Sequence, residues 1–161
     1  MRIRTITSGL LSVALLSAGT VVATATPAAA ATPKCTQAVK MKPRANSSYF
    51  MLVPKSSTTV ACSMSHGTSG SAVRALQTAL AYCYNVVKDR SGNKFRPGDI
   101  DGVYGSATSW AVEHVQLLLW PTDPEMQDGI YGPATAINLK FPWHNPANDS
   151  IMSTCTRRDG S

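Results

Sequence analysis

The middle of the chain carries apolar residues at helical spacing. From Ser71 onward they follow one another at steps of three and four, at Val73, Leu76, Leu80, Cys83 and Tyr84. This spacing puts them on one face of an α-helix. Ser69 and Gly70, directly before it, are residue types that commonly start a helix. The pattern therefore predicts a first helix that begins at about residue 71.

Two further helices are predicted downstream. The second runs from about residue 106 to residue 119 and ends before Pro121, with an inward face formed by Thr108, Ala111, Val112, Val115 and Leu119. The third runs from about residue 133 to residue 141 and is ended by Pro142. Pro133 stands at its first position, where the missing N–H of proline costs nothing.

The flanking segments show little periodicity. Residues 31–61 are rich in Pro, Ser, Thr and Lys, and we expect an extended or irregular basic segment there. One apolar run, residues 49–53, could be a strand or an extended segment on the core, ended by Pro54. Residues 142–161 are expected to form a C-terminal tail. The predicted fold class is mainly α, a small three-helix domain over residues 62–141 with irregular N- and C-terminal extensions.

A sequence motif occurs twice in the helical part. Residues 101–112 read DGVYGSATSWAV, and residues 128–139 read DGIYGPATAINL. Asp-Gly favours a tight turn because Asp hydrogen-bonds its own backbone and Gly accepts a positive φ. We expect the aliphatic residue and the tyrosine that follow to anchor the turn to the core. The second glycine of each copy then opens a helix.

Together these motifs resemble the peptidoglycan-binding domain found beside many bacterial wall hydrolases. The resemblance covers about residues 67–141 and includes several linked motifs. Its first part is Gly67, Gly70, Val73, Leu76, Gln77 and Leu80. The two DGxYG copies follow, Asp101–Gly105 with Thr108 and Asp128–Gly132 with Thr135, and between them stand Ala111, Val112 and Gln116. The resemblance implies a three-helix fold that binds peptidoglycan.

Residues 1–30 are predicted to be a secretory signal peptide. Arg2 and Arg4 precede a mostly apolar run from Gly9 to Ala25, and a short alanine run follows Pro27. This layout is typical of a signal peptide with cleavage after Ala30. The densest apolar part, residues 10–16, is too short to cross the hydrocarbon core. We therefore expect no transmembrane segment and a secreted protein, extracellular or associated with the cell wall.

The chain is moderately basic. Its formal net charge is +6, of which the two arginines of the predicted leader contribute two. Part of the excess lies in an acid-free stretch that is typical of a solvated arm, formed by Lys34, Lys40, Lys42 and Arg44. A basic exported protein is attracted to anionic surfaces. We expect peptidoglycan or a muropeptide as the partner, with anionic wall polymers in addition, no nucleic acid, and a monomer.

The cysteines predict a disulfide-stapled domain. All four follow the predicted leader: Cys35, Cys62, Cys83 and Cys155. An even number in an exported protein implies two disulfides, and three pairings are possible. Their spacings lack the C-x₂₋₄-C knuckle of a zinc site. The preferred pairing is Cys62–Cys83, along the first helix, with Cys35–Cys155 joining the two tails.

The sequence shows no catalytic or metal-binding motif, and we expect no cofactor. The histidines are isolated, at His66, His114 and His144, without the spacing of a zinc peptidase. A glycosidase needs two carboxylates, one of them protonated in an apolar setting. The acids here are instead mostly turn formers, Asp99, Asp101, Asp123 and Asp128. No G-x-S-x-G motif occurs. We expect binding without turnover.

Helix N-termini are the first kind of group predicted to contact the ligand. They present unpaired backbone N–H groups and a dipole that favours the carboxylates of peptidoglycan stem peptides. In the second helix these groups lie at Gly105 and Ser106, and in the third at Gly132.

Aromatic side chains are the second kind, because their faces suit the apolar side of a sugar ring. Trp110 is the first candidate, since it lies off the inward stripe of its helix. Tyr104 and Tyr131 are included, although tyrosines at such positions are more often core anchors of the turn. Gln77 and Gln116 are expected to brace loops through hydrogen bonds.

Three functions are compatible with these features. The leading hypothesis is a secreted, non-catalytic module that holds itself or a partner on peptidoglycan. The alternative is a secreted interaction or inhibitor protein that acts on a wall enzyme or another protein through the basic segment and the loop at residues 88–96. A cryptic wall hydrolase is the third. Sedimentation with purified sacculi separates the first two, and release of soluble wall fragments would reveal the third.

Overall fold

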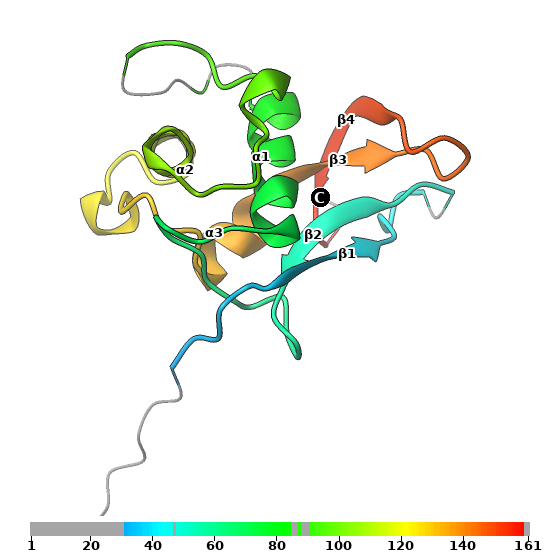
Figure 1. The fold of residues 1–161 in the computed structure, drawn as a ribbon, viewed down its shortest axis with the longest axis horizontal. Helices are drawn as coiled ribbons and strands as arrows, with labels where there is room; N and C mark the ends of the chain where they lie inside the picture. The colour runs from blue at the N-terminus through cyan, green and yellow to red at the C-terminus, as the bar shows by residue number, and fades with distance from the viewer. Residues whose placement is uncertain (1–30, 47, 85–86, 88–90, 160–161) are drawn as a thin grey trace, which may run out of the picture. The chain divides into compact units, whose positions relative to one another are not determined.

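The described part of the chain contains both α-helices and β-hairpins (Figure 1). The structure, a computed structural model, describes residues 31–46, 48–84, 87 and 91–159. The predicted signal peptide lies outside the described residues, and so do residues 88–90 of the loop named above. Residues 31–161 form one unit by their internal contacts.

The three predicted helices are present. Helix α1 spans Ser71–Cys83, α2 spans Ser106–Leu119 and α3 spans Pro133–Asn138. Short 3-10 turns, η1 at Pro97–Asp99 and η2 at Pro124–Met126, lie in the connections. Helix α3 ends before the predicted residue 141, because the backbone is already extended at residue 139. The chain then enters a strand.

Two antiparallel hairpins flank the helical segment in sequence. Strand β1, Gln37–Met41, pairs with β2, Met51–Lys55. Strand β3, Lys140–His144, pairs with β4, Ile151–Arg157. The segments on both sides of the helices are therefore regular strands. The prediction of a mainly α fold with irregular extensions is wrong.

Helix α1 is the centre of this arrangement. In Figure 1 it lies between α2 on one side and the hairpins on the other, and it contacts both β2 and β3. It is consequently buried on more than the single predicted face, and its additional buried positions are Ala72, Ala75, Gln77, Thr78 and Ala79. The small alanine side chains allow neighbouring backbone to approach closely.

The hairpins depend on this packing. Strands of five to seven residues are marginal as isolated two-stranded ribbons. Strand β2 buries Met51 and Val53 completely. Pro54 does not end the strand, since it pairs with Ala38 in register. At the start of β3, the N–H of Lys140 donates to the Tyr84 hydroxyl across 2.9 Å, directly after α1 ends.

Each disulfide holds one hairpin. Cys35 before β1 is bonded to Cys62 after β2, and Cys83 at the end of α1 is bonded to Cys155 in β4. Two disulfides are confirmed, but the preferred pairing, Cys62–Cys83 with Cys35–Cys155, is wrong. The hairpin explains the difference, because it brings its own two ends together: the Cys35 N–H donates to the Ser63 carbonyl across 3.0 Å.

Peptide mapping without reduction should therefore yield Cys35–Cys62 and Cys83–Cys155. A linked Cys62–Cys83 peptide would contradict the fold of the first hairpin.

Replacing both Cys83 and Cys155 by alanine should lower the free energy of unfolding by about 4 kcal/mol, because the cross-link closes a long loop in the unfolded chain. Denaturant titration of the oxidised protein and the double variant measures this difference.

Candidate functional site

The first DG turn is held by a glutamine of α1. Gln77 is 1% exposed, and its Oε1 accepts the Gly102 N–H across 2.7 Å. Its Nε2 group faces three acceptors, at 2.8 Å from Asp101 Oδ1, 3.0 Å from the Val103 carbonyl and 3.0 Å from Thr108 Oγ1. One buried amide thus binds the turn, and the loop-bracing role predicted for it is confirmed.

The second DG turn repeats this arrangement with a glutamine of α2. Gln116 is 2% exposed, and its Oε1 accepts the Gly129 N–H across 2.9 Å. Its Nε2 group lies 2.9 Å from Asp128 Oδ1, 3.0 Å from the Ile130 carbonyl and 3.0 Å from Thr135 Oγ1. The structural repeat therefore includes a helical glutamine in front of each DGxYG motif.

Both aspartates are occupied within their turns. Besides the glutamine, Asp101 Oδ1 accepts the N–H of Val103 across 2.8 Å, and Asp128 Oδ1 accepts that of Ile130 across 2.9 Å. The hydrogen bond from Gln77, followed by that from the Val103 N–H, lowers the pKa of the Asp101 carboxyl below its ordinary value. The turn is therefore more stable when the Asp101 carboxyl group is ionised.

The two copies of the motif also contact each other. The Tyr104 hydroxyl donates to the Gly129 carbonyl across 2.8 Å. Gly129 has a φ of +66°, and a Cβ there would lie 2.8 Å from Ser109 Oγ and 3.0 Å from the Ser109 carbonyl oxygen. Only glycine fits this position, since both the backbone conformation and the close approach of α2 exclude a side chain.

A short segment before α1 joins the two turns. We call residues 63–68 the linking strip. Met64 exchanges both backbone hydrogen bonds with Tyr131, at 2.9 and 3.0 Å. Farther along, the N–H of Gly67 donates to the Tyr104 carbonyl across 2.9 Å, and the Tyr104 N–H donates to the Thr68 carbonyl across 2.8 Å. One end of the strip is thus fixed to the second turn and the other end to the first.

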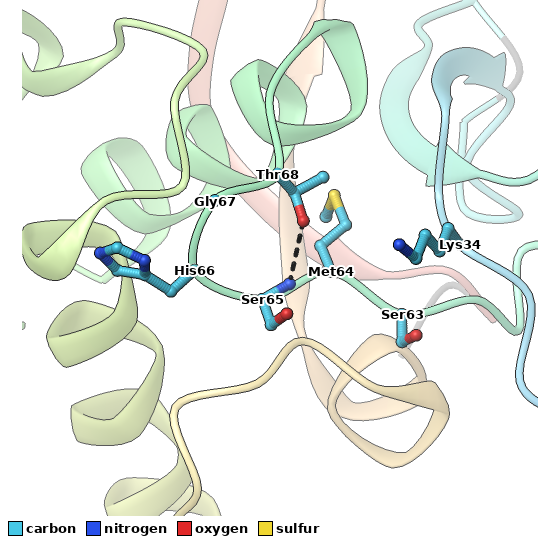
Figure 2. Close-up of a pocket in the computed structure, with 7 residues that line it drawn as sticks. All are labelled: Lys34, Ser63, Met64, Ser65, His66, Gly67 and Thr68. Atoms are coloured by element: carbon cyan, nitrogen blue, oxygen red, sulfur yellow. Dashed lines mark hydrogen bonds between the residues drawn. The ribbon is translucent and has the colours of Figure 1, made fainter.

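A groove of about 320 Å³ lies along this strip and is lined by Lys34, Ser63, Met64, Ser65, His66, Gly67 and Thr68. In Figure 2, the ammonium end of Lys34 is directed toward the strip from a separate segment, whereas the His66 ring points away from Lys34. The Ser65 N–H donates to Thr68 Oγ1 across 3.3 Å, and this hydrogen bond closes a turn within the strip. The groove therefore presents one ammonium group, several side-chain hydroxyl groups and the polar groups of the strip backbone to a ligand.

The predicted helix starts adjoin the strip. Gly105 and Gly132 directly follow the two tyrosines whose backbones pair with it, and they are the N-cap residues of α2 and α3. Neither helix start has a side-chain cap. Ser106, the first residue of α2, is exposed. Gly105, Ser106 and Gly132 thus lie next to the two points where the strip is attached, although none of them lines the groove.

Of the residues expected to anchor each turn in the core, the tyrosine is buried and its aliphatic neighbour is exposed. Tyr104 and Tyr131 are both 0% exposed, and burial raises the pKa of both hydroxyls. They are core anchors and present no side-chain surface to a ligand. Val103 and Ile130, expected to anchor the turns in the core, are instead 49% and 40% exposed. That part of the prediction is wrong, because the tyrosine alone fills the space beneath each turn.

Trp110 lies half-buried on α2, four residues after Ser106 and hence on the same side of the helix. It is not among the residues that line the groove. Conversely, sequence reasoning did not identify the linking strip or Lys34 as part of a site. The available signal was the turn-forming run from His66 to Gly70, in which both glycines adopt a positive φ.

Two further observations concern the described residues alone. No group of three or more His, Cys, Asp and Glu side chains in this part of the chain is placed to hold a metal ion. None of the helices found there is long and apolar enough to cross a membrane.

A comparison with known protein families gives a match over the segment that carries both DGxYG turns. Residues 69–139 match the model of the peptidoglycan binding domain family. The resemblance seen in the sequence is thereby confirmed. No curated protein matches the chain, and no solved structure does.

The matched peptidoglycan-binding segment contains α1, α2, α3 and both DGxYG turns, and it indicates a role in binding the cell wall. The whole linking strip lies directly before this segment, and Lys34 lies farther upstream. Both hairpins lie outside it, since β1 and β2 precede residue 69 and β3 begins at Lys140. The matched segment thus supplies the two turns that hold the linking strip, and the residues that line the groove lie before that segment.

The Asp101 turn predicts a specific acid sensitivity. Because the folded pKa of Asp101 lies below its ordinary value of 3.8, its contribution to stability is present above that value and is lost as the pH falls through the folded pKa. Asp101→Asn keeps an acceptor oxygen for Gln77 and the Val103 N–H but cannot titrate. Its unfolding midpoint in urea should fall less than that of the unmodified protein between about pH 5 and pH 2.5.

Asp123→Asn is the matched control, because Asp123 is exposed in the connection between α2 and α3. It should retain the acid sensitivity of the unmodified protein. Equal slopes of stability against pH for Asp101→Asn and the unmodified protein would contradict the role given to the carboxylate.

Proposed function

We propose that this protein is a secreted, non-catalytic module that binds peptidoglycan. The observation that carries the proposal is the family match over residues 69–139, which includes both turns whose tyrosines pair with the linking strip. The two disulfides are consistent with an extracellular or wall-associated location. Export through the predicted signal peptide is part of the same proposal.

The groove suits the chemistry of the wall. Peptidoglycan stem peptides expose carboxylates and amides. The Lys34 ammonium group can form a charge-assisted hydrogen bond with a carboxylate, and the hydroxyls of Ser63, Ser65 and Thr68 can bond amides. The start of α2 at Ser106 adds backbone donors close to the linking strip, whereas the Gly105 N–H already donates to the Val103 carbonyl across 2.9 Å. Trp110 remains a proposed contact for a sugar, one helical turn after Ser106.

Binding without turnover is supported by the state of the acids in the repeats. Asp101 and Asp128 each accept a glutamine N–H and a backbone N–H in their turns. The lowered pKa of Asp101 keeps this carboxyl ionised at neutral pH. A general acid for glycoside cleavage needs the opposite shift. Both side chains thus serve the turns in this proposal.

The mature protein should co-sediment with purified sacculi and release no soluble sugar or peptide from them. Lys34→Gln removes the groove cation and should weaken binding by about threefold to fivefold, the typical value of one exposed charge contact. Lys94→Gln removes the same charge from an exposed residue that does not line the groove, and should bind as the unmodified protein does.

Two results would contradict the proposal. If the protein stays in the supernatant at every salt concentration, the wall-binding function is wrong and a protein partner becomes the better hypothesis. If soluble muropeptides or sugars accumulate, the protein is a hydrolase.

A further inference from the structure

A second groove lies at the junction of the two hairpins, which Figure 1 shows on the side of α1 away from α2. It has a volume of about 330 Å³ and is lined by Lys40, Lys42, Ser48, Tyr49, Phe50 and Pro146. We call it the hairpin groove. All six residues lie outside the segment that matches the family. The peptidoglycan-binding proposal gives it no role.

The aromatic wall of the hairpin groove is held rigidly. The Tyr49 ring stacks on Trp143, with centroids 5.4 Å apart and an angle of 26° between the planes. Trp143 is itself fixed, because its Nε1–H donates to Thr156 Oγ1 across 3.0 Å. Tyr49 remains partly exposed. The hairpins therefore present an ordered ring at the surface.

Phe50 is the second aromatic side chain that lines the hairpin groove. It is 6% exposed and stacks on His144, with centroids 5.1 Å apart. The two residues also exchange backbone hydrogen bonds, at 3.2 and 2.7 Å, and these bonds join the first hairpin to the second. Lys40 Nζ lies 4.1 Å from the centroid of the Phe50 ring. This cation–π contact holds one ammonium group at the groove.

The charge around the hairpin groove is positive. Lys40 and Lys42 line it, Arg44 follows two residues later, and residues 31–61 contain no acid. Asp149 approaches from the second hairpin, 3.5 Å from Lys40 Nζ, with side chains that are 62% and 73% exposed. An ion pair this exposed contributes little and can give way to an anionic ligand.

We propose that the hairpin groove binds a phosphodiester-linked polyol or sugar polymer of the cell wall. Lysines bind phosphate groups as point charges, whereas planar carboxylates favour the fork of arginine. The fixed aromatic ring offers an apolar face to the carbon skeleton between phosphates. The protein then has two contacts with the wall, the groove along the linking strip for peptidoglycan and the hairpin groove for the anionic polymer.

Binding of soluble poly(glycerol phosphate) to the mature protein tests this proposal at low salt. The variant K40Q/K42Q should raise the Kd about tenfold, because two charge contacts are lost. The control K94Q/K140Q removes two equally exposed charges that do not line the groove and should change the Kd by less than about twofold. Tyr49→Ala should weaken binding by about threefold with both lysines present.

Polygalacturonate and single-stranded DNA serve as comparison ligands. The proposal expects both to bind more weakly than poly(glycerol phosphate). Equal or tighter binding of either one, or equal losses in the K40Q/K42Q and K94Q/K140Q variants, would overturn it, because net charge or another polymer class would then account for the binding. The single variant K42Q serves if K40Q/K42Q shows an altered melting temperature.

Sacculi stripped of phosphodiester-linked polymers separate this proposal from the peptidoglycan-binding function. The unmodified protein and K40Q/K42Q should co-sediment with stripped sacculi equally well, since the groove along the linking strip is intact in both. Failure of both proteins to bind stripped sacculi would count against the peptidoglycan function and leave the hairpin-groove test standing.

Discussion

A buried side-chain amide must have both its N–H and its carbonyl groups satisfied, because each orphaned polar group costs about 1–3 kcal/mol. Gln77 and Gln116 meet this requirement through the DG turns and through a threonine of the helix that follows each turn. Each accepts the N–H of the turn glycine and faces an aspartate oxygen, a backbone carbonyl and a threonine hydroxyl. The two glutamines thus fix the position of each turn relative to a helix.

The groove follows from this constraint. Each turn carries a tyrosine whose backbone pairs with the linking strip, Tyr104 at one end and Tyr131 at the other. If either turn shifts, the strip loses one of its two attachments and the groove loses its shape. The hydrogen bond from Tyr104 to Gly129 makes the positions of the turns interdependent. The shape of the groove that we propose for peptidoglycan therefore depends on two buried amides that do not line it.

The repeat could be predicted from the sequence because its signals are local. Helical spacing, the Asp-Gly turns and the prolines fix the starts of all three helices, and the two glutamines stand at the expected places. The hairpins could not be predicted, because residues 37–41 and 151–157 alternate weakly and form strands only where α1 and the disulfides support them. The disulfide pairing, Lys34 and the linking strip depend on those tertiary contacts.

Amide hydrogen exchange in the variant Gln77→Met tests the central claim most directly. Methionine keeps the approximate volume of the side chain but offers the turn neither the carbonyl nor the N–H groups. The Gly102 amide should exchange at least about tenfold faster than in the unmodified protein, because its buried acceptor is gone. The Gly129 amide, held by Gln116, should keep most of its protection. Unchanged protection of Gly102 would contradict the claim that the buried amide holds the turn.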